Sequence, residues 1–98
     1  MTAAPWFVYL IECRNGSVYT GIAVDVEARY AAHCEGRGAR FTRMHPPSRL
    51  LAAFACRDRS EASRAEAAIK RCSPSRKREL AAAGCLQDVW RALAPNEA

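Results

Sequence analysis

Two apolar runs near the start of the chain, FVYLI at 7–11 and VYTGI at 18–22, flank the polar segment RNGS at 14–17. Both runs are rich in β-branched and aromatic residues, which favour strands. The Asn-Gly pair between them tolerates the positive φ that a tight hairpin turn needs. The segment therefore predicts an antiparallel β-hairpin, with strands at 6–13 and 18–22.

Each run carries one tyrosine, and the length of the hairpin loop decides whether both rings lie on one face of the sheet. A two-residue Asn-Gly turn pairs Tyr9 with Ile22, which puts Tyr9 and Tyr19 on opposite faces. A three-residue loop at 14–16, with its glycine in the left-handed region, pairs Tyr9 with Gly21 and puts both rings on the same face. The local sequence is compatible with either register.

The segment after the hairpin predicts a short amphipathic helix followed by a loop. Asp25 suits the N-cap, apolar residues recur at helical spacing from Val26 to Cys34, and Gly36 ends the helix. Residues 35–49 contain two glycines and two prolines, which break regular elements. We therefore expect a loop over the whole of 35–49.

The second half of the chain predicts one more strand and three helices. The strand is expected at 50–56, which is apolar. Asp58, with Glu61 three residues later, resembles a capping box at the start of the next helix. The helices are expected at 61–71, from a Ser-Pro start at 73–74 to a stop at Gly84, and at 86–94.

The size and charge of the chain restrict what it can be. Its 98 residues suffice for one domain, expected over 1–98 with a core at about 6–80. Lys and Arg number 15 against 10 acidic residues, giving a net charge of +5. Arginine dominates these cations, and its guanidinium binds phosphate oxygens in a bidentate fork. This charge is equally compatible with a nucleic-acid partner and with an ordinary solvated surface.

The cysteines and the hydropathy indicate a cytoplasmic protein. The cysteines are odd in number and form no Cys-x-x-Cys pair, which favours reduced, small core residues over a disulfide framework or a zinc site. They are Cys13, Cys34, Cys56, Cys72 and Cys85. No apolar run approaches the roughly 20 residues that span a bilayer, and the first residues do not resemble a signal peptide. We therefore expect no membrane partner.

Several short motifs occur in an order and spacing that suggest a family. They are VYL at 8–10, YTG at 19–21, Arg29 and His33 in the first helix, GRG at 36–38, and DRSEA at 58–62 followed by Glu66. Together they resemble the GIY-YIG nuclease domain in its small single-domain bacterial form, from about Trp6 to Glu79. The resemblance implies an α/β fold, a small three-stranded antiparallel sheet flanked by helices.

The same resemblance implies hydrolysis of phosphodiester bonds with one Mg²⁺ or Mn²⁺ ion held by Glu66. Tyr9 and Tyr19 would position and deprotonate the attacking water, Arg29 would clamp the phosphate, and His33 would assist. Two cooperating tyrosines must share a face of the sheet. The nuclease hypothesis therefore predicts the three-residue loop.

Physical chemistry supports these roles but also offers an ordinary interpretation of each residue. Tyrosine, with a pKa of about 10, is a poor base unless a cation lowers that value. Magnesium keeps most of its waters, so one carboxylate and a substrate phosphate suffice to hold it. Taken singly, however, the two tyrosines could be packing residues, Arg29 a solvated residue, His33 a surface residue and Glu66 the partner of Lys70.

Seven further cations are candidate phosphate contacts: Arg37, Arg40, Arg43, Arg71, Arg76, Lys77 and Arg78. The leading hypothesis is a DNA endonuclease that selects structure rather than sequence, because the chain has no room for a module that reads base edges. One alternative is a module of the same fold that binds DNA or RNA with little or no catalysis. Another is a domain that docks an acidic protein.

The chain also departs from the family pattern. The first tripeptide, Val8-Tyr9-Leu10, lacks the family's glycine and isoleucine, and Thr20 replaces an isoleucine in the second tripeptide. Ile22 stands where many larger relatives carry lysine, and no asparagine matches the one expected after the metal glutamate. We therefore expect slow turnover or dependence on a protein partner for targeting.

Overall fold

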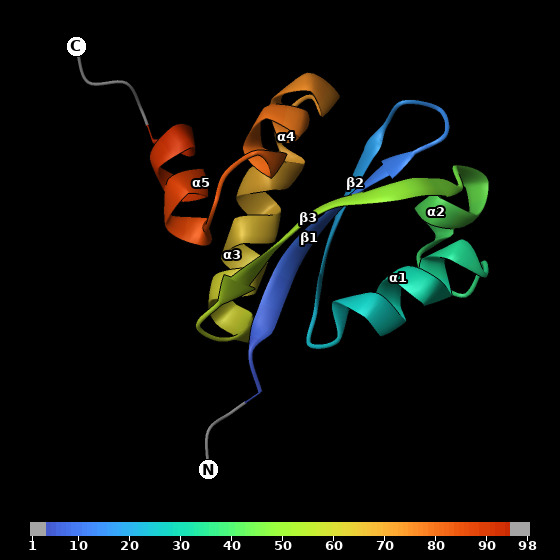
Figure 1. Ribbon diagram of the computed structural model, residues 1–98, viewed down its shortest axis with the longest axis horizontal. Coiled ribbons are helices and arrows are strands. Elements are labelled where there is room, and N and C mark those ends of the chain that lie inside the picture. Colours follow the sequence, from blue (N-terminus) through green and yellow to red (C-terminus); the bar gives the residue numbers. More distant parts are fainter. Residues whose placement is uncertain (1–3, 95–98) are drawn as a thin grey trace.

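The computed structural model describes residues 4–94, which form three layers (Figure 1). The middle layer is a three-stranded antiparallel sheet of order β2-β1-β3. Its strands are β1 (Trp6–Cys13), β2 (Val18–Ala23) and β3 (Pro47–Cys56). Helices α1 (Val26–Cys34) and α2 (Arg40–Met44) lie on one face, and α3 (Arg59–Lys70), α4 (Pro74–Ala81) and α5 (Leu86–Leu93) lie on the other. This arrangement confirms the predicted fold class.

The β1–β2 hairpin has the three-residue loop. The Cys13 N–H donates to the Ser17 carbonyl at 2.9 Å, and the Gly16 N–H donates to the Cys13 carbonyl at 3.0 Å. Gly16 has a φ of 88°, in the left-handed region where glycine carries no steric penalty. The loop therefore closes as a turn followed by a glycine bulge.

This loop sets the register on which the site depends. Tyr9 pairs with Gly21, and Ile11 pairs with Tyr19. Because side chains alternate along a strand, both tyrosines project from the same face of the sheet. The register predicted from the nuclease hypothesis is confirmed.

The alternation of β1 divides the interior into two apolar clusters. Val8 and Leu10 point toward the layer of α3, α4 and α5, where Ala62, Ala65 and Ile69 supply the buried stripe of α3. On the opposite face, the side chains beneath α1 are Tyr9, Ile11, Cys13 and Ala23, flanked by Tyr19, Val26 and Tyr30. The larger cluster is therefore structural, and the smaller one contains both tyrosines.

Three helices have the N-cap residues that the sequence predicts, although α3 begins two residues before the expected position 61. Asp25 caps α1, Asp58 caps α3 and Ser73 caps α4, each by accepting a backbone N–H three residues on. Glu61 reaches back to the Arg57 N–H at 2.7 Å, as in a capping box displaced by one residue. These caps satisfy donors that the first helical turn leaves free.

The prediction of a loop throughout 35–49 is wrong. Gly36, with a φ of 78°, does end α1, but α2 and the first residues of β3 lie within this segment. Pro47 begins β3 opposite Cys13, beside a register irregularity. Proline is tolerated at the first residue of an edge strand because no ladder hydrogen bond is required of it there.

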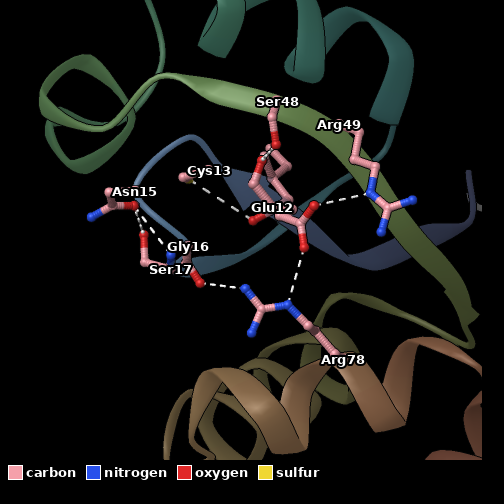
Figure 2. A network of polar contacts seen from close by, with 9 residues as sticks. Glu12, Cys13, Asn15, Gly16, Ser17, Ser48, Arg49 and Arg78 are labelled. Atoms are coloured by element: carbon pink, nitrogen blue, oxygen red, sulfur yellow. Dashed lines mark hydrogen bonds and ion pairs between the residues drawn. The ribbon is translucent and has the colours of Figure 1, made fainter.

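A polar network joins the end of the hairpin to β3 and α4 (Figure 2). The Glu12 carboxylate accepts hydrogen bonds from Arg49 Nε and Arg78 Nε, each at 3.0 Å. Arg78 also donates to the Gly16 carbonyl, and Ser48 Oγ donates to the Glu12 carbonyl at 3.1 Å. Hydrogen bonds from Arg78 and then Arg49 hold the pKa of Glu12 below its ordinary value. The loop is thereby tied to both neighbouring elements.

The cysteine prediction is only partly right. All five thiols lie within residues 4–94 and are free, and Cys13 and Cys56 are buried. Cys34 and Cys85, however, are exposed, because they lie at a helix end and just before a helix rather than on a buried stripe. No helix in the described range is long and apolar enough to cross a membrane.

Candidate active site

The two tyrosines lie side by side beneath α1, with Gly21 next to both. Tyr9 is 1% exposed, and its ring centroid lies 6.4 Å from that of Tyr19. A Cβ atom at Gly21 would lie 2.4 Å from Tyr9 Oη and 3.1 Å from a ring carbon of Tyr19. The Tyr9 ring therefore occupies space that is free only because Gly21 has no side chain.

His33 projects from α1 into this pair of rings. It is 1% exposed, so the expectation of a surface histidine is wrong: the residue lies on the side of α1 that packs against the sheet. Its ring centroid is 5.0 Å from that of Tyr19, and its Nε2 lies 2.9 Å from Tyr9 Oη. Tyr9, Tyr19 and His33 thus form a compact aromatic cluster with one internal hydrogen bond.

The environment keeps the hydrogen-bonded pair uncharged. Burial, followed by the charge of Tyr19, raises the pKa of Tyr9 to about 12, although Arg29 lowers it. Burial, followed by the charge of Arg29, lowers the pKa of His33. At neutral pH the site therefore contains a phenol and a neutral imidazole.

Arg29 lies on α1 one turn before His33 and brings positive charge to the cluster. The residue itself is exposed, yet its guanidinium acts on the pKa of both Tyr9 and His33. A guanidinium that is both exposed and close to two buried polar groups is placed to meet an anionic ligand entering from solvent.

Glu66 approaches from the other helical layer. It follows Ala62 and Ala65 on α3, and its side chain is 24% exposed and lies 3.4 Å from Lys70 Nζ. Its carboxylate is the last of the charges that raise the pKa of Tyr9, so its field reaches the aromatic cluster. The ion pair with Lys70 matches the ordinary interpretation of Glu66, and its effect on the pKa of Tyr9 is compatible with a role in the site.

The donor groups fit a hard cation that keeps most of its waters. Among residues 4–94, no group of three or more His, Cys, Asp or Glu side chains is placed to hold a metal. That excludes a closed protein cage within this range, whereas one accessible carboxylate such as Glu66 is the kind of ligand that Mg²⁺ accepts alongside substrate phosphate. The residues present are therefore compatible with one Mg²⁺ or Mn²⁺ ion.

The candidate phosphate contacts are divided between the two helical layers. Arg40 and Arg43 are exposed on α2, on the same side of the sheet as the aromatic cluster, and Arg37 just before them pairs with Glu35. Arg71, Arg76 and Arg78 belong to the α3–α4 side, where the last two are engaged in ion pairs with Glu79 and Glu12. Only the first group lies on the side of the sheet that holds the aromatic cluster.

Lys77 does not suit the predicted phosphate contact. It is 9% exposed, and its Nζ donates to the Val18 carbonyl at 2.8 Å. Burial lowers its pKa. Its ammonium is directed into the protein at the β2 edge of the sheet, which is a structural role.

Three residues of the segment 38–42 belong to the site although the sequence assigned a site role to none of them, and Gly38 appeared only within the GRG motif. Thr42 is 1% exposed and lies 2.7 Å from His33 Nδ1. A Cβ at Gly38 would lie 2.3 Å from the same atom, and the Phe41 ring stacks on Tyr19 with a centroid separation of 5.9 Å. The sequence feature that could have indicated them is the apolar-polar pair at 41–42, which is unusual within an expected loop.

Comparison with known proteins agrees with this fold. Residues 5–79 match the family model of the GIY-YIG catalytic domain. The chain therefore belongs to the GIY-YIG family, and its membership supports a nuclease-type function.

Within that family the chain is similar to bacterial UPF0213 proteins. It is 53% identical over 73 residues to UPF0213 protein XAC3202 of Xanthomonas axonopodis pv. citri, covering 74% of this chain and 72% of the relative. It is 49% identical over 76 residues to UPF0213 protein DP2720 of Desulfotalea psychrophila, covering 76% of this chain and 69% of that relative. The solution NMR structure of UPF0213 protein BH0048 from Bacillus halodurans superposes with a TM-score of 0.50 at 35% identity, covering 94% of this chain and 99% of that one.

Proposed function

We propose that this protein is a metal-dependent endonuclease that hydrolyses DNA phosphodiester bonds and selects its substrate by structure. The observation that carries the proposal is the buried Tyr9–His33 hydrogen bond of 2.9 Å beside Tyr19, with the exposed Arg29 guanidinium next to it. A proton-transfer pair next to a cation is what attack of water on a phosphodiester requires.

Tyr9 and His33 would handle the proton. Because the pKa of Tyr9 is raised to about 12, the phenol does not ionise at neutral pH and needs a neighbour that accepts its hydrogen. His33 is that neighbour, and its lowered pKa keeps it neutral and able to accept. Tyr19, whose ring packs against both, would orient the water.

Arg29 and Glu66 would handle the charge. The Arg29 guanidinium donates hydrogen bonds to the non-bridging phosphoryl oxygens, whose negative charge grows as water attacks. Glu66 would hold the Mg²⁺ or Mn²⁺ ion, which supplies positive charge for the phosphate and the departing oxygen. The exposed Arg40 and Arg43 would bind flanking phosphates on the same side of the protein.

Cleavage of defined substrates tests the proposal. Purified protein is incubated with branched, flapped and linear DNA and with RNA, with Mg²⁺, with Mn²⁺ or with EDTA. We expect metal-dependent cleavage of branched or flapped DNA, reduced about a hundredfold or more in Tyr19→Phe and Glu66→Ala. Glu79→Ala, which removes an exposed carboxylate on α4, is the matched control and should cut normally.

Other outcomes point elsewhere. DNA or RNA binding without cutting above the Glu66→Ala background would make the protein a nucleic-acid-binding module. Cleavage that appears only with a cell extract would indicate a protein partner for targeting. Cleavage of every linear duplex at the same rate would contradict selection by structure.

A further inference from the structure

The buried hydroxyl of Thr42 has two hydrogen-bond partners. Its Oγ1 donates to the Ala39 carbonyl at 2.9 Å and lies 2.7 Å from His33 Nδ1. A hydroxyl has a single hydrogen, so while it donates to Ala39 it can meet His33 only as an acceptor. His33 must then carry its hydrogen on Nδ1.

That tautomer determines the direction of the next hydrogen bond. A neutral imidazole with hydrogen on Nδ1 has a free lone pair on Nε2. Nε2 lies 2.9 Å from Tyr9 Oη, so it accepts the Tyr9 hydroxyl hydrogen. The hydrogen bonds from Tyr9 through His33 and Thr42 to the Ala39 carbonyl all run in one direction, and the phenol oxygen does not accept a hydrogen bond from His33.

The opposite tautomer has one contact in its favour. The Ala39 N–H lies 3.4 Å from His33 Nδ1, which suits a nitrogen without hydrogen. That contact is long for a hydrogen bond, whereas 2.7 and 2.9 Å are near the optimum. The opposite tautomer would also turn the Thr42 hydrogen away from the Ala39 carbonyl. Removing the Thr42 oxygen therefore removes the feature that favours hydrogen on Nδ1.

We propose that Thr42 is a positioning residue that fixes the hydrogen of His33 on Nδ1, so that Nε2 accepts the proton of Tyr9. The catalytic consequence rests on the proposed nuclease function. As the water oxygen bonds to phosphorus, its proton passes to the Tyr9 oxygen and the Tyr9 hydrogen passes to Nε2. The P–O bond to the leaving group breaks, the leaving oxygen takes a proton from solvent, and His33 returns its proton to solvent.

Gly38 supports the ring from its other side. A Cβ there would lie 2.3 Å from His33 Nδ1 and 2.7 Å from Cγ, so the backbone at Gly38 packs directly on the imidazole. The ring is thus held between this backbone and the two tyrosines, while Thr42 determines only which nitrogen carries the hydrogen. This separation of roles makes the proposal testable without moving the ring.

The test is the tautomer of His33, read from imidazole ¹⁵N chemical shifts of labelled protein. The chain has two histidines, and His45 is an internal reference because its Nδ1 lies 3.0 Å from Asn15 Nδ2, which can only donate. We expect hydrogen on Nδ1 of His33 in wild type and Thr42→Ser, but on Nε2 of His45. In Thr42→Val, which keeps the shape and lacks the hydroxyl, His33 should change to hydrogen on Nε2.

Cleavage kinetics give the second readout. Thr42→Val should lower kcat about tenfold or more with little change in DNA affinity, and Thr42→Ser should restore most of it. Hydrogen on Nε2 of His33 in wild type, or an unchanged tautomer in Thr42→Val, overturns the proposal; the wild-type spectrum decides it even if the valine variant does not fold. The expected tautomers in a protein that cuts no DNA would support the role of Thr42 and refute the nuclease function.

Discussion

Gly21 shows how one missing side chain shapes the site. Tyr9 lies opposite it in the sheet, and the phenol occupies the space where a Cβ would be. In the same way, the His33 ring occupies the space where a Cβ of Gly38 would be. At the scale of single residues, the site depends on two glycines, because large rings are buried directly against their backbone.

Gly21→Ala should displace the Tyr9 ring. The added Cβ would meet Oη at 2.4 Å and Cζ at 2.5 Å, so the ring must shift and its hydrogen bond with His33 is disturbed. We expect cleavage to fall at least about tenfold and stability to fall by about 1–3 kcal/mol, as in other overpacked sites. Gly84→Ala is the control, because its Cβ would make an ordinary 3.5 Å contact; equal losses in both variants would contradict this account.

Thr20→Val should stabilise the protein. Within residues 4–94, Thr20 Oγ1 is the one buried side-chain polar atom without a hydrogen-bond partner, and the residue is 2% exposed. Valine has the same shape without the desolvated hydroxyl, so the free energy of unfolding should rise by about 1 kcal/mol. Urea denaturation measures the change, and a decrease would indicate that a buried water satisfies the hydroxyl.

His33 should make stability depend on pH. Its pKa is lowered from 6.5 in the folded protein, so the unfolded chain binds more protons as pH falls below that value. The free energy of unfolding should therefore be greatest above about pH 6.5 and decrease below it, until the folded pKa is passed. The groups that face His33 are Tyr9, Tyr19 and Arg29.

Comparison with His33→Gln isolates this effect. The difference in melting temperature between the two proteins should change only in this window. Glu12 and Asp58, whose pKa values are lowered below 4.5 and 3.8, account for losses in more acidic solution. A difference that stays constant from pH 5 to 8 would show that the pKa of His33 is not lowered.

The secondary-structure elements divide into those that local sequence determines and those that it does not. β1, β2 and the starts of three helices follow from alternation and capping residues, all of which act over a few positions. α2 has five residues and no side-chain cap, and Thr42 within it contacts His33 of α1. No local signal of this kind marks α2, and the contact that joins it to α1 links residues that the sequence alone does not pair.

The Glu12 network should hold the hairpin loop against α4 (Figure 2). In Glu12→Gln, Arg49 and Arg78 lose their charged partner, and Arg78 in turn holds the Gly16 carbonyl less firmly. We expect faster amide hydrogen exchange in residues 14–17 and little change in α5. Glu79→Gln, which alters only an exposed pair with Arg76, should leave the loop unchanged. Unaltered exchange in Glu12→Gln would show that the turn is rigid without these arginines.

At the scale of the whole molecule, positive charge is divided between two sides of the sheet. Arg40 and Arg43 lie on the side of the aromatic cluster, and no ion pair engages either of them within the described range. Composition revealed the excess of charge but not this division, because the side of the sheet on which each cation lies is set by the packing of distant elements. The Lys77 prediction was wrong for the same reason.

DNA binding should therefore depend on one side of the molecule. Arg40→Ala with Arg43→Ala should weaken binding and reduce the slope of log K against log salt by about 0.9 for each duplex phosphate that these arginines neutralise. Arg91→Ala on α5 is the matched control. Lys77→Met should leave the salt slope unaltered, since its ammonium is buried on Val18. Equal effects of all three changes would place the DNA elsewhere.

The candidate site itself could be predicted only in part. The joint spacing of Tyr9, Tyr19, Arg29 and Glu66 was visible in the sequence, and the register that unites the tyrosines followed from it. Thr42 was not visible, because a threonine nine residues after His33 becomes a partner only when α2 folds back onto α1. Resemblance pointed to the proposed reactive groups, whereas the proposed positioning residue became visible only in the structure.

The three-layer arrangement also bears on when the protein could first act during its synthesis. The tyrosines, Arg29 and His33 all precede β3, whereas Glu66 lies on α3, which packs on the opposite face of the sheet. A nascent chain extended as far as Cys56 thus carries every proposed reactive group except the metal ligand. Any cleavage that needs Glu66 must therefore wait until the second helical layer has emerged from the ribosome and docked on the sheet.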